Sequence, residues 1–154
     1  METVIAVKLS GIDENGYMYP HATVRPDVCS ICKNRIKDVP NLAYKVKKKH
    51  ANLLATYDDY LIVSQKMKDF CELNQYEDVE FIALPESSGF YYFTVHKVYE
   101  LDYEKQKTKF INYRNCCGNY DEIIGSSFFT KKGFSMETDD FIRRTEFRFA
   151  SYAF

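Results

Sequence analysis

Four of the five cysteines lie in two clusters that are far apart in the sequence. The first cluster is Cys29-Ser-Ile-Cys32, which follows a Pro-Asp turn, and the second is Cys116-Cys117-Gly118. A C-x-x-C turn can present two sulfur atoms to one metal ion, and zinc in structural sites takes four ligands in a tetrahedron. We therefore expect the two clusters to meet in one structural zinc site, with Cys29, Cys32, Cys116 and Cys117 as its ligands.

The second cluster departs from a regular C-x-x-C-Gly pattern. Arg114 stands where that spacing would place a cysteine, and the adjacent cysteines reach one metal ion only with an altered turn. Cys117 is the better ligand, because Gly118 follows it and permits a tight turn. If Cys116 faces away, His21 could be the fourth ligand, although a lone histidine in a strand is more often simply hydrogen-bonded.

The first pair has two competing interpretations. A thioredoxin-like redox pair opens a helix in a βαβ context, where its thiol pKa is lowered, whereas mixed polar residues and Pro40 follow Cys29 and Cys32. Two free thiols in a turn are the other alternative. In the cytosol, where thiols stay reduced, such a pair indicates metal or redox chemistry before it indicates a structural disulfide. Cys71 lies on an apolar helix face and is expected to be a small core residue.

The composition is typical of one soluble globular domain spanning residues 1–154, with 45% hydrophobic and 28% charged residues. The net charge of −1 argues against a general nucleic-acid binder, which needs a basic surface. Met1-Glu2-Thr3 does not resemble a signal peptide, and no apolar run reaches the about 18 residues of a membrane span. We therefore expect a cytoplasmic protein without membrane contact; no feature of the sequence specifies its oligomeric state.

Local patterns predict strands with one or two helices. The apolar run Val4–Leu9 predicts a first strand, and Asn15-Gly16 predicts a hairpin turn that leads to a return strand at Tyr17–Arg25. Ser64 is expected to cap a helix, because its hydroxyl can accept a hydrogen bond from the first turn. The other expected features are a strand at Tyr60–Val63, an apolar helix face of Met67, Phe70 and Cys71, a helix end at Asn74, and strands at Val79–Leu84, Phe90–Leu101 and Lys109–Tyr113, the last two joined across the turn Asp102–Thr108.

A short similarity within the chain bears on its C-terminal part. Asp58-Asp59-Tyr60-Leu61 recurs as Asp139-Asp140-Phe141-Ile142, and Ser64 then aligns with Thr145. By analogy Thr145 caps a C-terminal helix, although the alternation of Phe147 and Phe149 also fits a strand. The apolar face of that helix would comprise Phe147, Ala150, Ser151 and Phe154. The elements together predict an α+β domain of mainly antiparallel strands, one or two helices and a zinc-ribbon-like cysteine clasp.

Catalytic patterns are absent from the sequence. His50 and His96 have no partner at catalytic spacing, and no Gly-rich phosphate loop, H-E-x-x-H or G-x-S-x-G occurs. The adjacent carboxylates Asp58-Asp59 and Asp139-Asp140 point to opposite faces of a strand, so they do not form an acid–base pair. We therefore expect a protein that is not an enzyme.

Two other segments could bind a partner, but each also has a structural interpretation. The basic run Lys45–His50 could hold phosphate or an acidic protein, or could be a solvated loop. The aromatic segment Phe90–Phe93 could stack on bases or sugars or contact a protein, but one face of such a strand usually belongs to the core.

The two cysteine clusters and their surroundings resemble the bacterial double-CXXCG motif family. The similar parts are His21–Cys32, Cys116-Cys117-Gly118, Ile123–Phe129 and the segment from Asp139 to Phe147; Lys33 stands where the family has a glycine. Members look like immunity proteins, which neutralise a toxin delivered by neighbouring bacteria. The resemblance implies a non-catalytic protein that binds a cognate toxin, with the two cysteine pairs as structural zinc ligands. It implies no particular toxin-binding residue.

Two alternatives of other classes stay open beside toxin binding. A zinc-ribbon module could bind single-stranded nucleic acid through Lys45, Lys47, Lys48 and Lys49 together with exposed tyrosines. A redox-responsive protein could use Cys29 and Cys32. Thiol reactivity with and without a chelator distinguishes the redox protein from a zinc protein, and salt-sensitive binding to single strands identifies the nucleic-acid module.

Overall fold

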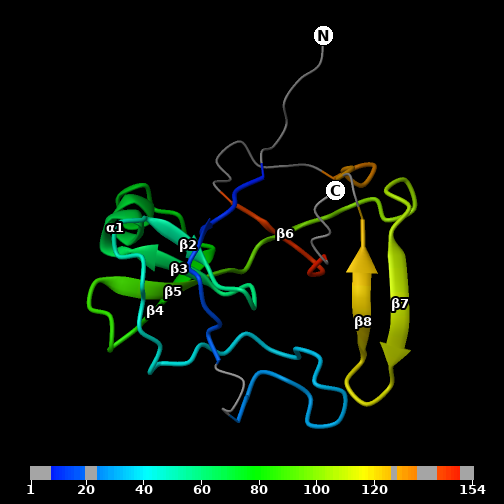
Figure 1. Cartoon of the computed structure of the whole chain (residues 1–154). Helices are drawn as coiled ribbons and strands as arrows, with labels where there is room; N and C mark the ends of the chain where they lie inside the picture. Colours follow the sequence, from blue (N-terminus) through cyan, green and yellow to red (C-terminus); the bar gives the residue numbers. More distant parts are fainter. Residues whose placement is uncertain (1–7, 20–23, 126–127, 135–141, 150–154) are drawn as a thin grey trace. The chain divides into compact units, whose positions relative to one another are not determined.

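The chain is divided into two compact units (Figure 1). In this computed structural model the described residues are 8–19, 24–125, 128–134 and 142–149. Unit 1 comprises Met1–Thr23 and Pro40–Thr94, and unit 2 comprises Val24–Val39 and Val95–Phe154. The described chain is an α+β protein with mostly strands, one helix and a cysteine cluster, as predicted. The extent of 1–154 as one domain stays a prediction.

A five-stranded mixed sheet forms the centre of unit 1, with the order β1-β2-β3-β5-β4. β2 pairs antiparallel with β3, and β3 pairs antiparallel with β5, whereas β1 runs parallel to β2. The sheet is therefore only partly antiparallel. Its strands are β1 (Ile12–Asp13), β2 (Leu53–Ala55), β3 (Leu61–Ser64), β4 (Val79–Ala83) and β5 (Phe90–Val95).

The only helix in the described residues, α1 (Gln65–Leu73), begins and ends where the sequence predicts. Ser64 is the N-cap, with extended backbone angles, and its hydroxyl accepts a hydrogen bond from the Met67 amide at 3.3 Å. Asn74 is the C-cap. The predicted apolar face is narrower than expected, because Cys71 is buried whereas Phe70 is 44% exposed. No helix in the described ranges has the length and apolar character that a membrane span requires.

Aromatic rings fill the core of unit 1. Tyr60 has no exposed surface, and its ring contacts those of Tyr19 and Tyr92 at centroid distances of 6.0 and 5.6 Å. Phe90, Tyr92 and Phe93 of β5 are buried, so the aromatic segment contributes mainly to the core. The core cluster consists of Met18, Tyr19, Tyr44, Val46, Ala51, Leu54, Tyr60, Ile62, Leu84, Phe90 and Tyr92.

The predicted N-terminal hairpin is wrong for the described residues. Asn15 does form a turn, with φ of 60°, but β1 pairs in parallel with β2, and Tyr17–Tyr19 form no strand. The cause is the buried carboxylate of Glu14, which accepts the backbone amides of Lys47 and Lys48. The turn is thereby held on the loop that follows residue 44, and the chain does not return along β1. Most of the predicted strand Val4–Leu9 and residues 20–23 lie outside the described residues.

Unit 2 contains two small sheets. β7 and β8 form an antiparallel hairpin in which Arg114 pairs with Asn119, and β6 runs parallel to β9. The predicted pairing of β7 with the strand before it is therefore wrong, because β8 takes its place; the strand predicted at Phe90–Leu101 is interrupted at His96-Lys97. The strands are β6 (Val98–Tyr99), β7 (Lys109–Arg114), β8 (Asn119–Ile124) and β9 (Arg144–Thr145).

The C-terminal helix predicted from Thr145 is wrong where the structure describes it. Thr145 lies in β9, and its hydroxyl donates to the carbonyl of Phe147 at 2.7 Å, so it does not cap a helix. Phe147 packs on the rings of Tyr103 and Phe110, both at 5.4 Å, which draws the chain away from a helical path. Residues 139–141 and 150–154 of the predicted segment lie outside the described residues.

The two units differ in how much apolar surface they bury. Among the described residues, 14 of the 18 buried hydrophobic side chains belong to unit 1. The four in unit 2 are Cys29, Val95, Leu101 and Ile123. Among the described residues, unit 2 thus has the smaller apolar core.

Candidate metal centre

The first two cysteines lie on a tight turn, which we call the knuckle (residues 26–35). An antiparallel bridge joins Val28 to Arg35, and the Cys29 amide donates to the Asn34 carbonyl at 2.8 Å. The Lys33 amide donates to the Cys29 carbonyl at 3.0 Å. These bonds close the turn over Ser30 and Ile31, so that both cysteine sulfurs face the same region.

Lys33 takes the backbone conformation for which a glycine is the usual residue. Its φ is 66°, in the left-handed region that costs a side-chain-bearing residue about 1–2 kcal/mol. Its ammonium group donates to the carbonyl of Ser30 at 2.8 Å, which fixes the side chain across the turn. The missing glycine therefore leaves the knuckle intact and adds local strain.

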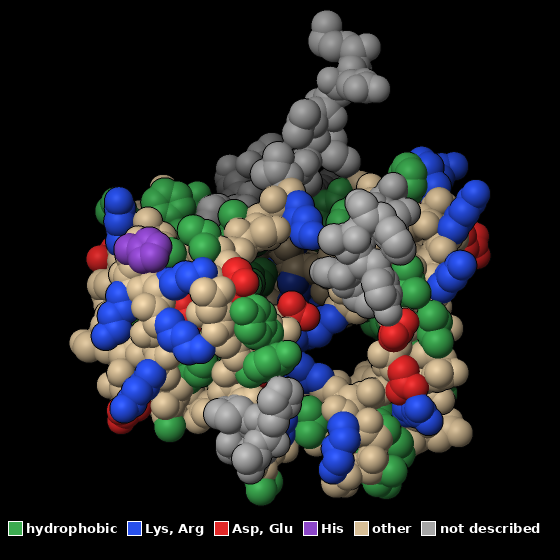
Figure 2. All heavy atoms as spheres, viewed as in Figure 1, with side chains coloured by type: hydrophobic (Ala, Val, Ile, Leu, Met, Phe, Trp, Pro, Cys, Tyr) green, Lys and Arg blue, Asp and Glu red, His purple; other side chains and the backbone are tan. Residues whose placement is uncertain are grey.

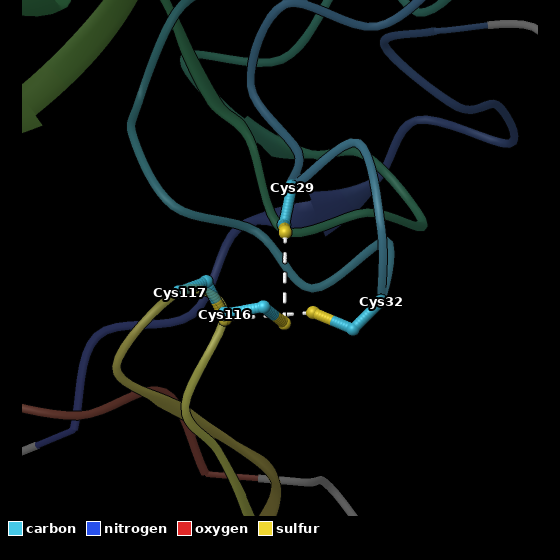
Figure 3. A group of neighbouring side chains, drawn as sticks. All are labelled: Cys29, Cys32, Cys116 and Cys117. Atoms are coloured by element: carbon cyan, nitrogen blue, oxygen red, sulfur yellow. Dashed lines mark hydrogen bonds between the residues drawn. The ribbon is translucent and has the colours of Figure 1, made fainter.

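The other two cysteines lie at the tip of the hairpin (β7, β8 and the loop between them). The loop has four residues, Asn115 to Gly118, and the amides of Cys117 and Gly118 both donate to the Arg114 carbonyl, at 3.1 and 2.8 Å. Gly118 has φ of 73°, as expected of the glycine that permits the turn. In this altered turn the adjacent residues Cys116 and Cys117 both extend toward the knuckle (Figure 3).

The four sulfur atoms converge on one point, and we call this group the cysteine clasp. All four Sγ atoms lie within 4.8 Å of one another (Figure 3). The Sγ atoms of Cys29 and Cys116 are 3.9 Å apart, and those of Cys32 and Cys117 are 3.4 Å apart. Zinc–sulfur bonds of about 2.3 Å in a tetrahedron require sulfur–sulfur distances of about 3.8 Å. The observed spacing thus suits a tetrahedral thiolate site.

Polar side chains beside the clasp join the knuckle to the hairpin. The Asn34 amide group donates to the Tyr120 carbonyl at 3.3 Å and to the Asp121 carboxylate at 3.0 Å. In the opposite direction, the Asn119 side chain donates to the Arg35 carbonyl at 3.2 Å. These hydrogen bonds join the two segments that carry the cysteines.

Arg114 and Asp121 form a further support inside the hairpin. The guanidinium donates to both carboxylate oxygens at 2.5–2.9 Å, a forked ion pair. This contact, with that from Asn34, lowers the pKa of Asp121 to about 2, and the carboxylate in turn raises the pKa of Arg114. Arg114 stands where a regular motif would place a cysteine, and its carbonyl and side chain organise the loop instead.

The thiols of the clasp titrate differently. Hydrogen bonds from the backbone amides of Cys32 and Ile31 lower the pKa of Cys29 to about 7. The pKa of Cys116 rises to about 12, mainly because its thiol donates to Cys32, and burial raises that of Cys117. Of the three thiols with shifted pKa values, Cys29 is therefore the one that most readily carries a negative charge without a metal ion. A divalent cation would replace the shared protons and allow all four sulfurs to ionise.

At the start of the knuckle, a partly buried ion pair holds the turn. The Asp27 carboxylate has no exposed surface and accepts the Arg25 guanidinium at 3.1 and 2.7 Å. Its backbone carbonyl accepts the Ile36 amide at 2.8 Å. The Pro-Asp pair before Cys29 therefore has a second role beside forming the turn, because the Asp27 carboxylate neutralises the Arg25 guanidinium at the base of the knuckle.

The remaining candidates do not join the clasp. His21 and Asp139-Asp140 lie outside the described residues. Cys71 is buried in unit 1, as expected of a core residue, and burial raises its pKa. Asp58 accepts the Met18 amide and the Thr56 hydroxyl, both at 2.8 Å, so the first carboxylate pair has a structural role.

The basic run is largely committed to contacts within unit 1. The ammonium groups of Lys47 and Lys48 donate to the carbonyls of Asn15 and Asp13, and Lys45 pairs with Glu86 at 3.7 Å. Figure 2 shows Lys and Arg side chains together with Asp and Glu on the viewed face. These contacts favour the structural interpretation of the run.

The supporting residues Asn34, Arg114, Asn119 and Asp121 were not found by sequence reasoning. Each stands within five positions of a cysteine, which is the one pattern that could have identified them. Comparison of the chain with protein-family models, curated proteins and solved structures gives no match.

Proposed function

We propose that this chain is a non-catalytic protein-binding protein whose unit 2 is built around a structural zinc ion held by the cysteine clasp. The supporting observation is the convergence of four sulfur atoms within 4.8 Å from two segments far apart in sequence. All-thiolate tetrahedral sites favour zinc, and four protein ligands leave no open position for catalysis. Zinc would supply folding energy by joining two parts of a unit with few buried side chains.

Metal analysis tests the zinc centre. Protein purified under reducing conditions is expected to hold one zinc ion per chain, which a strong chelator removes with a fall in thermal stability. Cys32→Ser is expected to lose the metal, because loss of even an outer-shell partner costs about 10–100-fold in metal affinity. Cys71→Ala is the matched control and should retain zinc, since Cys71 lies in unit 1. The zinc centre would be refuted if the purified protein contained no zinc and its thermal stability changed neither on addition of zinc nor on addition of chelator.

For the partner, we propose a cognate bacterial toxin, on the basis of the resemblance to the double-CXXCG motif family. The protein would occlude the toxin by stoichiometric binding, through complementary shape and charge, without turnover. In such a role the clasp is structural and the toxin contacts lie elsewhere on the surface.

Co-expression with the neighbouring gene tests the toxin proposal. If the adjacent open reading frame encodes a toxin, its product should stop bacterial growth when expressed alone, and this chain should restore growth. The two purified proteins should then form a complex of fixed stoichiometry that resists moderate salt. An adjacent product that is toxic but neither binds this chain nor is neutralised by it would contradict the proposal.

A further inference from the structure

The four clasp residues differ in their exposure to solvent. Cys116 is exposed, Cys32 and Cys117 are half-buried, and Cys29 is buried. A small oxidant therefore approaches the clasp most openly at Cys116. The chemistry of this first contact depends on which sulfur lies close enough to react next.

A thiol across the clasp is within reach of each hairpin sulfur. The Sγ atoms of Cys116 and Cys29 are 3.9 Å apart, and those of Cys117 and Cys32 are 3.4 Å apart. A disulfide between the adjacent residues Cys116 and Cys117 is disfavoured, because consecutive Cα atoms lie about 3.8 Å apart and disulfides span about 4.4–6.8 Å. Oxidation of the hairpin sulfurs thus favours bonds to the knuckle.

We propose that the clasp is a peroxide-sensitive switch that exchanges its metal ion for disulfides between the knuckle and the hairpin. The proposal rests on the zinc centre and names its regulation. Hydrogen peroxide oxidises the zinc-bound Cys116 thiolate to a sulfenic acid and, with one proton from solvent, is reduced to water. The Cys29 thiolate then displaces the hydroxyl group, which leaves with a second proton as water, and the Cys29–Cys116 disulfide forms. A second equivalent of peroxide joins Cys32 to Cys117 in the same way.

Metal release follows because a disulfide sulfur carries no thiolate charge with which to hold zinc. The released state differs from chelated protein in one respect. The disulfide links positions 87 residues apart, the same two segments that the metal joined, so the knuckle stays attached to the hairpin. Oxidation would therefore free the metal while unit 2 keeps its closure, and a dithiol reductant would restore the thiols.

Peptide mapping distinguishes this switch from a redox pair within the knuckle. Trypsin leaves Cys29 and Cys32 together in Leu9–Lys33, since it does not cut between Arg25 and Pro26, and leaves both hairpin cysteines in Asn115–Lys131. Zinc-loaded protein is treated with hydrogen peroxide, released zinc is followed with a colorimetric indicator, and the digest is analysed without reduction. The expected result is release of the bound zinc with appearance of the two peptides joined, both reversed by dithiothreitol.

Several results would overturn the switch. Zinc retained under peroxide, or disulfides confined to Leu9–Lys33, would each do so. Cys71→Ala, the matched control, should release zinc and form the joined peptides as the unaltered protein does. Metal-free protein is oxidised in parallel, so that formation of the joined peptides can be measured even if the protein binds no zinc. Failure to bind zinc would refute the proposed centre, whereas failure to join the peptides would refute the switch alone.

Discussion

At the residue scale, Lys33 shows how the knuckle tolerates a departure from the usual motif. Its positive φ of 66° places a side-chain-bearing residue where glycine is normally favoured. The turn persists because the Cys29 carbonyl accepts the Lys33 amide, and the ammonium group reaches Ser30. The strain is local, and its removal provides a direct test of the turn.

Lys33→Gly is expected to leave zinc affinity unchanged or to raise it slightly. Relief of the left-handed conformation stabilises the folded protein by about 1–2 kcal/mol. The greater freedom of glycine in the unfolded chain offsets about 0.5–1 kcal/mol of this gain. Competition titration against a chelator and thermal unfolding of the zinc-bound protein measure the effect. Lys37→Gly, at an exposed position after the knuckle without a positive φ, is the control and should gain nothing. A marked loss of zinc affinity in Lys33→Gly alone would contradict the turn described here.

Residue types predicted the clasp better than they predicted its surroundings. The sequence predicts that all four cysteines of the clasp approach one another, because thiols in tight turns suit a metal, and Cys116 reaches the others through a loop closed on the Arg114 carbonyl. That loop depends on the β7–β8 hairpin, and the sequence of β8 has no strong pattern that predicts a strand. The supporting role of Asp121 was not predictable, because it arises from a contact with Asn34, 87 positions away.

At the scale of elements, the hairpin and the knuckle are joined by side chains as well as by sulfur. Asp121 accepts both the forked guanidinium of Arg114 and the Asn34 amide group. Because the folded pKa of Asp121 is lowered to about 2, its contribution to stability is present above the unfolded pKa of about 4. That contribution is lost as the pH falls through about 2.

Asp121→Asn is expected to weaken zinc retention without abolishing it. The variant loses the ion pair, and a fall in zinc affinity at the lower end of the about 10–100-fold range of outer-shell contacts is expected. The rate of zinc transfer to a chelator at neutral pH measures this weakening of zinc retention. Glu100→Gln removes another exposed ion pair of unit 2, that with Lys131, and is the matched control. Equal transfer rates in Asp121→Asn and unaltered protein would show that the sulfurs alone hold the metal.

Elements with local determinants were predictable, and those decided by distant contacts were not. β3, α1 and β4 follow an apolar run, a serine cap and a proline stop at Pro85, each of which lies within the element or beside it. The parallel pairing of β1 depends on the buried Glu14 and the loop it holds. The C-terminal helix fails because Phe147 packs on Tyr103 and Phe110. Neither contact is visible in the pattern of neighbouring residues.

At the scale of the whole molecule, burial and charge are divided unequally between the units. Unit 1 holds 14 of the 18 buried hydrophobic side chains of the described residues. The full sequence of unit 2 carries 14 basic and 11 acidic residues, whereas that of unit 1 carries 7 and 11. Stability of unit 1 can therefore come from apolar burial. Unit 2, whose described residues bury few apolar side chains and whose sequence carries an excess of positive charge, would gain most from a metal held by thiolates.

Chelation is therefore expected to loosen unit 2 and to leave unit 1 ordered. Amide hydrogen exchange of the zinc-bound protein is compared with that of protein treated with a chelator. The amides that close the knuckle and the β7–β8 hairpin should exchange at least about tenfold faster after chelation, which corresponds to about 1.4 kcal/mol of local stability. Those of β3 and β5 should change little, because their core contains no ligand. Cys32→Ser should resemble the chelated protein and should not respond further to chelator. Equal acceleration in both units would show that the clasp supports the entire chain, and no acceleration would show that unit 2 is stable on apolar burial alone.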